Sequence, residues 1–124
     1  MIFTETINKN EEYVKIYKRG TYKVGPLLVT YAYKRNDETV KMGITTSKKI
    51  GNAVKRNRAR RVLRAAYSEI ESSVPKGWSF VFVARSLTAK VKSTDVAKQM
   101  KEHIESIIKR EGNSADNGIG EKKC

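Results

Sequence analysis

Basic side chains dominate one stretch of this sequence. Eight lysines and arginines, and no acidic residue, lie between Lys48 and Arg64. Guanidinium groups bind phosphate oxygens in a two-pronged geometry, so the chemistry on offer is the binding of a polyanion. The candidate binding set, which includes one asparagine on the same predicted helix face, is Lys48, Lys49, Lys55, Arg56, Asn57, Arg58, Arg60, Arg61 and Arg64.

Tyrosines form a second candidate set. Tyr13 and Tyr17 are four residues apart and share one face of a predicted helix, while Tyr31 and Tyr33 share one face of a predicted strand. If that helix packs at the edge of the sheet, the rings border a groove whose other wall is the start of the basic helix, near Arg56. Aromatic faces stack on unpaired bases of any sequence. The alternative is that these tyrosines are ordinary core residues.

Catalytic machinery is not evident in the sequence. No glycine-rich loop ends in Gly-Lys-Ser or Gly-Lys-Thr, and no pair of histidines or cysteines has the spacing of a zinc site. His103 has no acid or nucleophile placed by sequence to work with it, so we expect a surface or partly buried histidine rather than a catalyst. We therefore predict no catalytic residue and no metal ligand in the polypeptide.

Composition bounds the class of protein. The 124 residues are enough for one domain, and 26 basic against 13 acidic residues give a net charge of +13. Such an excess makes nucleic acid the leading partner, ahead of an anionic membrane, since no apolar run approaches the roughly 18–20 residues that span a bilayer. The start of the chain does not resemble a signal peptide. The one cysteine, Cys124, is the last residue, which favours the reducing cytoplasm.

The basic stretch is predicted to be a helix rather than a disordered tail. Apolar residues recur through it at three- and four-residue steps, from Ala59 to Ile70, while arginines recur on roughly the opposite face. Asn52 is a good N-cap for a helix over 53–71. The expected apolar stripe consists of Ala59, Val62, Leu63, Ala66 and Ile70.

Strands are predicted on both sides of this helix. Residues 27–35 and 39–49 are rich in β-formers and separated by a turn, which predicts an antiparallel hairpin. Residues 78–84 form a continuous apolar run, typical of a central strand covered on both faces. The order strand, long helix, strand predicts that 39–49 and 78–84 pair in parallel.

Two further helices are predicted. Asn8 or Asn10 is expected to cap the first, and Gly20 to end it. Ser93 or Thr94 is expected to cap the second, which has an apolar stripe and is expected to stop at Gly112. We therefore expect a single domain over residues 1–111 and a mobile polar tail over 112–124.

The basic stretch also resembles a known family. The sequence SKKIGNAVKRNRARRVLR at 47–64 is similar to the signature of the bacterial ribonuclease P protein subunit, with its Lys-Lys pair, Asn-Ala-Val and Arg-Asn-Arg. Residues 9–20 resemble that family's first helix, and 27–33 and 79–85 resemble two of its strands. The resemblance covers about residues 5–110 in order.

The resemblance implies a fold. Members of the family are α+β proteins with a two-layer sandwich, in which helices pack on a four-stranded sheet in the order αβββαβα. It also implies a left-handed β-α-β crossover, whereas the pattern of elements alone favours the right-handed form.

The resemblance further implies a function. Members bind a large catalytic RNA, and the complex removes the 5′ leader of precursor tRNA by magnesium-dependent hydrolysis that the RNA carries out. It implies Mg²⁺ held through RNA and substrate, no membrane, and no obligate protein partner. By motif position, the RNA-facing residues are Lys48, Lys49, Arg56, Asn57, Arg60, Arg61 and Arg64, and the leader cleft is lined by Tyr13, Tyr17 and Tyr31. The family's first-helix aromatics are commonly phenylalanine, so a tyrosine hydroxyl is added here.

Two other functions compete with this interpretation. A ribosomal or other basic RNA-binding protein, or a nucleoid-type DNA binder, fits the charge equally well but not the Arg-Asn-Arg motif after Lys-Lys-Ile-Gly. A self-sufficient nuclease would need carboxylates for metal, and the acidic residues are scattered rather than paired. Co-purification with one long RNA that cleaves precursor tRNA separates these hypotheses.

Overall fold

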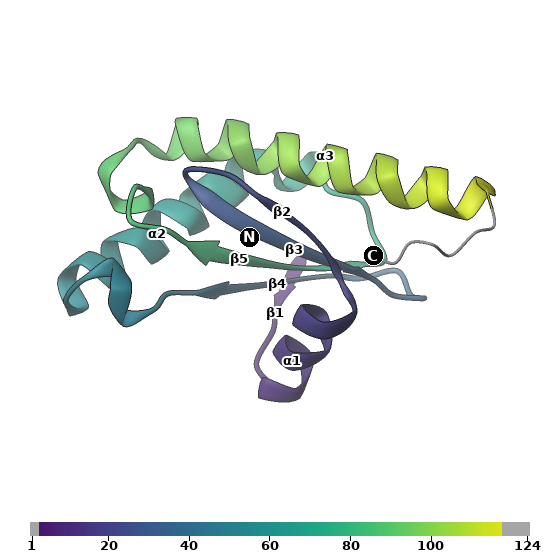
Figure 1. Cartoon of the computed structure of the whole chain (residues 1–124), viewed down its shortest axis with the longest axis horizontal. Coiled ribbons are helices and arrows are strands. Elements are labelled where there is room, and N and C mark those ends of the chain that lie inside the picture. Colours follow the sequence, from purple (N-terminus) through teal and green to yellow (C-terminus); the bar gives the residue numbers. More distant parts are fainter. Residues whose placement is uncertain (1–2, 118–124) are drawn as a thin grey trace.

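A mixed five-stranded sheet lies between helices on its two faces (Figure 1). The computed structural model describes residues 3–117, with side chains for residues 3–110. The elements are β1 (Thr4–Thr6), α1 (Asn10–Arg19), β2 (Thr21–Val24), β3 (Leu28–Lys34), β4 (Val40–Thr45), the 3₁₀ turn η1 (Lys48–Ile50), α2 (Ala53–Ile70), η2 (Glu71–Ser73), β5 (Trp78–Ala84), η3 (Thr88–Lys90) and α3 (Ser93–Asn117). Helices α2 and α3 cover one face, and α1 crosses the other. The class is the expected α+β.

The order of strands in the sheet is β1-β4-β5-β3-β2. Strands β4 and β5 pair in parallel, as predicted, and α2 connects them. The predicted hairpin of β3 with β4 is wrong, because β5 lies between them and pairs with both. Six of the seven residues of β5 are buried, so this most apolar strand takes the centre of the sheet.

The sheet has five strands rather than the expected four, and the order of elements begins with a strand. Strand β1 pairs in parallel with β4, with Thr4 opposite Val40. Its side-chain partners are Tyr67 at the end of α2 and Glu71 in η2, both more than 60 residues away in sequence. The buried carboxylate of Glu71 accepts hydrogen bonds from the backbone N–H of Phe3 and Thr4, at 3.2 and 3.1 Å. The Tyr67 hydroxyl lies 2.8 Å from Thr4 Oγ1.

The main core lies between the sheet and the helices α2 and α3. The predicted stripe of α2 faces it, with Ala59, Leu63 and Ala66 fully buried and Val62 at its margin. Tyr67 joins the stripe and is also fully buried. The side chain of Asn52 caps α2 by accepting from Lys55 N–H at 3.0 Å, as predicted.

Three helix ends were predicted with mixed success. Gly20 ends α1 as expected, but its N-cap is Lys9, whose side chain makes no capping bond, and neither Asn8 nor Asn10 fills that role. The expected stop at Gly112 is wrong, because α3 continues to Asn117. A glycine inside a helix costs only about 0.5–1 kcal/mol and does not end it. Residues 118–124, with Cys124, lie outside the described residues, and the mobility of the tail stays a prediction.

Candidate nucleic-acid interface

The outer face of α2 carries cations that form no ion pair with a carboxylate in the described part of the chain. Arg60, Arg61 and Arg64 are exposed. Within the described residues, none of the eight basic side chains from Lys48 to Arg64 forms an ion pair with a carboxylate; the ion pairs Arg35–Asp37 and Lys41–Glu12 lie elsewhere. The positive charge of this face is therefore left for an external anion.

Two arginines of the predicted set also donate hydrogen bonds to backbone carbonyl groups. Arg56 is partly buried and donates from Nη1 to the Gly51 carbonyl at 2.7 Å. Arg58 donates from Nε to the Ala89 carbonyl at 2.7 Å and so connects α2 to η3. Both residues therefore position the turns beside the helix, in addition to any contact with a ligand.

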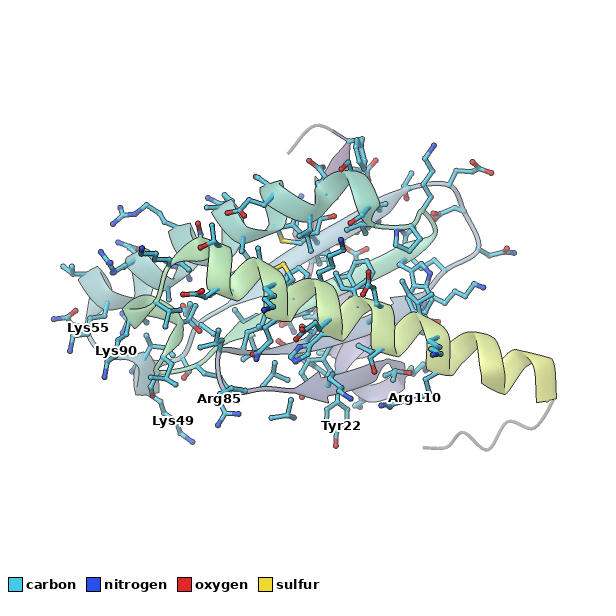
Figure 2. The ribbon with its side chains drawn as sticks, turned by 90° about the horizontal axis from the view of Figure 1, so that it is seen from above. Tyr22, Lys49, Lys55, Arg85, Lys90 and Arg110 are labelled. Carbon is cyan, nitrogen blue, oxygen red and sulfur yellow. The ribbon has the colours of Figure 1, made fainter. Side chains whose placement is uncertain are left out.

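The start of α2 gathers further cations. Lys48 and Lys49 lie in η1, not at the end of a strand as expected, because the Ser47 side chain accepts from Lys49 N–H at 3.3 Å and closes a 3₁₀ turn. Figure 2 shows Lys49, Lys55 and Lys90 extending outward at the same end of the molecule. Lys90 was not among the predicted residues. It lies outside the dense basic run, and η3 brings it to α2 only in the fold.

A shallow groove runs across the sheet on the α1 side. Its floor is a row of neighbouring residues on adjacent strands, because Val29 is in register with Val83 and Val83 with Thr45. A depression of about 270 Å³ is lined by Tyr17, Val29, Tyr31 and Val83. The structure therefore has an apolar depression beside two of the four predicted tyrosines, Tyr17 and Tyr31, and its role as a leader cleft stays a prediction.

Two of the predicted tyrosines form the side of this groove. The rings of Tyr17 and Tyr31 meet edge to face, with centroids 4.8 Å apart. The Tyr17 hydroxyl lies 3.4 Å from Thr45 Oγ1 across the floor. Tyr17 is 39% exposed, so it is not an ordinary core residue.

Tyr13 lies at the inner end of the same row of rings, 6.4 Å from Tyr17 between centroids. It packs over Gly43, where a Cβ atom would lie 2.5 Å from the Tyr13 hydroxyl oxygen, so the glycine makes room for the ring. Burial raises the pKa of Tyr13, whereas the positive charge of Arg60 lowers it. Arg56, which was expected at the other wall of the groove, instead donates to the Gly51 carbonyl.

Tyr33 makes no ring-to-ring contact with the other three tyrosines within the described residues. Lys15 Nζ lies 5.3 Å from the centre of its ring, and Tyr33 packs with the small core under α1. The depression does not include it. Tyr22, which sequence reasoning missed, lies at the other end of the groove and stacks on Tyr31 with a centroid distance of 5.5 Å. Only the alternation within the short strand β2 could have revealed it.

Two further properties bear on function. Among the described residues, no three His, Cys, Asp or Glu side chains gather into a group that could hold a metal ion. Within the same part of the chain, no helix has both the length and the apolar character of a membrane span.

Comparison with known proteins gives a consistent result. The family model described as Ribonuclease P matches residues 2–108. The ribonuclease P protein component of Dehalococcoides mccartyi is 37% identical over 95 residues, which cover 77% of this chain and 78% of the relative. That of Clostridium novyi is 36% identical over 111 residues, which cover 87% of this chain and 94% of the relative.

Solved structures share the fold. The RNase P protein of Staphylococcus aureus aligns with a TM-score of 0.68 at 25% identity, over 81% of this chain and 92% of that chain. The RNase P protein from Thermotoga maritima aligns with a TM-score of 0.73 over 83% of this chain and 97% of that chain. At 22% identity, the second likeness concerns the fold alone.

Proposed function

The chain belongs to the ribonuclease P protein family and is a protein subunit of ribonuclease P, and we propose that its two adjoining surfaces bind the two RNAs of that enzyme. The outer face of α2 contacts the RNA subunit. The groove between α1 and the open part of the sheet binds the 5′ leader of precursor tRNA. Family membership disfavours the alternative of a ribosomal or other basic RNA-binding protein without processing activity.

The unpaired cations of α2 carry the first half of the proposal. Exposed arginines at positions 60, 61 and 64 offer forked donors that match phosphate geometry. The helix begins in this cationic region, and the positive end of its macrodipole adds to the same field. Lys48 and Lys49 extend the surface beyond the helix.

The geometry of the groove carries the second half. The groove crosses three strand spacings between β2 and β4. At roughly 4.8 Å for each spacing it is about 14 Å long, which suits a short extended segment of RNA. Its apolar floor and aromatic side can stack on bases without reading their sequence. The basic run begins at Lys48 in η1, which follows Thr45 at the β4 end of the floor, and it supplies positive charge for the phosphates.

We assign the chemistry to the RNA subunit. Mg²⁺ then acts through the RNA and the substrate, and no residue of this chain is proposed as a magnesium ligand or a catalytic group. The protein binds the leader and so holds the substrate in place. The cytoplasm is the proposed compartment, with no obligate protein partner. Omitting the RNA subunit from a reconstitution tests this division, since cleavage by the protein alone would overturn it.

The leader site is tested by Tyr17→Ala in the reconstituted holoenzyme. A stacked base contributes roughly 1–3 kcal/mol, so we expect about 5- to 150-fold weaker binding of leader-bearing precursor tRNA. Binding of mature tRNA, which has no leader, should be unchanged. Val14→Ala is a matched control, because Val14 is also 39% exposed on α1 but lines none of the groove. Equal weakening of both substrates by Tyr17→Ala would contradict the proposal.

A further inference from the structure

An exposed tyrosine lies where the groove meets the edge of the sheet. Tyr22 is 55% exposed, although it is a large ring on the edge strand β2 (Figure 2). Its ring stacks on that of Tyr31 with an angle of 28° between the planes. Its hydroxyl makes no hydrogen bond within the described residues. One ring face is therefore covered by Tyr31, and much of the rest is open.

The register of the sheet places Tyr22 on the groove side. Tyr22 pairs with Tyr31, and Val24 pairs with Val29, which is part of the floor. The burial of β2 alternates, with Tyr22 and Val24 exposed and Thr21 and Lys23 half-buried. The rings of Tyr13, Tyr17, Tyr31 and Tyr22 thus form a continuous series across the sheet, from α1 to its edge.

We propose that Tyr22 is a leader-binding residue that extends the groove by one stacking position. This inference rests on the proposed function of the groove. The β4 end of the floor, at Thr45, leads directly into η1 at Lys48 and then into the helix assigned to the catalytic RNA, so the leader runs from there toward β2. Tyr22 then contacts the leader nucleotides farthest from the cleavage site, and Tyr17 contacts nearer ones.

A stacking role for Tyr22 can be distinguished from a role in which its ring only covers Tyr31. A cover would affect every substrate that depends on Tyr31, whatever the length of its leader. A stacking position at the end of the path matters only when the leader is long enough to reach it. The dependence of affinity on leader length is therefore the deciding measurement.

The experiment uses the reconstituted holoenzyme and precursor tRNAs whose leaders are lengthened one nucleotide at a time. We expect Tyr22→Ala to bind short-leader substrates like the wild type and long-leader substrates at least about 5-fold more weakly. Tyr22→Phe should retain the wild-type affinity, because the ring face remains. Val14→Ala again serves as the control, since Val14 is an exposed apolar side chain that lines none of the groove.

The outcomes distinguish this inference from the proposed function. Loss of affinity at the same leader length in Tyr17→Ala and Tyr22→Ala would make Tyr22 a support for Tyr31 and overturn the inference. No loss in Tyr22→Ala, with a loss in Tyr17→Ala, would also overturn it while leaving the groove as the leader site. No loss in either variant would reject both.

Discussion

Replacing Arg60 and Arg64 by glutamine should weaken binding of the RNA subunit and change its salt dependence. Both side chains are exposed, and neither pairs with a carboxylate in the described part of the chain. Within the described residues, the substitutions would remove one intramolecular hydrogen bond, the long one from Arg60 Nη1 to Asn57 Oδ1 at 3.5 Å. The melting temperature should therefore hardly change.

The size of the effect follows from counterion release. Each phosphate contact contributes about −0.9 to the slope of log affinity against log salt for duplexes, and about −0.7 for single strands. Two lost contacts should reduce the slope by about 1.4–1.8. Between 50 and 200 mM salt the variant should thus lose about tenfold less affinity than the wild type, starting from a weaker complex.

The assay is a titration of the RNA subunit at several salt concentrations, with thermal unfolding of the free variants beside it. Lys98→Gln with Lys101→Gln is the matched control, since both lysines are exposed on α3 and the net charge falls equally from +13 to +11. An equal change of slope in the control would mean that only total charge matters. An unchanged slope in the arginine variant, or a large drop in its melting temperature, would refute the contact role.

Three further predictions test the surroundings of the groove and the core. Gly43→Ala should push the ring of Tyr13 aside, because the new Cβ would lie 2.5 Å from its hydroxyl, and should weaken binding of leader-bearing precursor tRNA but not of mature tRNA. Burial raises the pKa of Tyr67 to about 12, so the free energy of unfolding should fall as the pH rises from about 10 to 12. In denaturant titrations, the free energy of unfolding of Tyr67→Phe should fall less over the same pH range. Burial lowers the pKa of His103 from 6.5, so on acidification this imidazole binds a proton more readily in the unfolded chain than in the folded one. The free energy of unfolding should therefore decrease as the pH drops below about 6.5. The decrease should be smaller in His103→Gln.

The sequence predicted α2 well because its signals are local. The Asn52 cap, the periodic stripe and the segregated arginines all act within one or two turns of the helix. The parallel pairing of β4 with β5 was predictable too, since a long helix joins them. The charge pattern alone left a ribosomal protein open, and it was the resemblance that distinguished ribonuclease P.

Long-range pairing was not predictable from the pattern. Strands β3 and β4 follow each other after a turn, yet β5 enters between them from more than 30 residues later. Strand β1 has three polar residues, and it depends on Glu71, 67 residues away from Thr4. Nothing near either segment in sequence indicates these partners.

The candidate site was predicted by residue type but not by placement. Alternation placed Tyr31 and Tyr33 on one face of β3, and both do lie on the α1 side. Alternation does not show where along that face α1 ends, so it could not separate Tyr31 in the groove from Tyr33 under Lys15. Tyr22 was missed because β2 has only four residues.

The unpaired charge of α2 also predicts opposite effects of salt on the free protein and on the complex. Eight basic residues and no acidic one lie within 17 positions, from Lys48 to Arg64, and the first of them, up to Arg56, lie at the positive end of the helix dipole. Their mutual repulsion destabilises the free fold, and salt screens it over a Debye length of about 10 Å at 0.1 M. Raising salt should therefore raise the melting temperature of the free protein while weakening its binding to the RNA subunit. In the Arg60→Gln, Arg64→Gln variant, both the rise in melting temperature and the loss of RNA affinity with salt should be smaller. A melting temperature of the wild type that fell with salt would mean that other electrostatic interactions outweigh this repulsion.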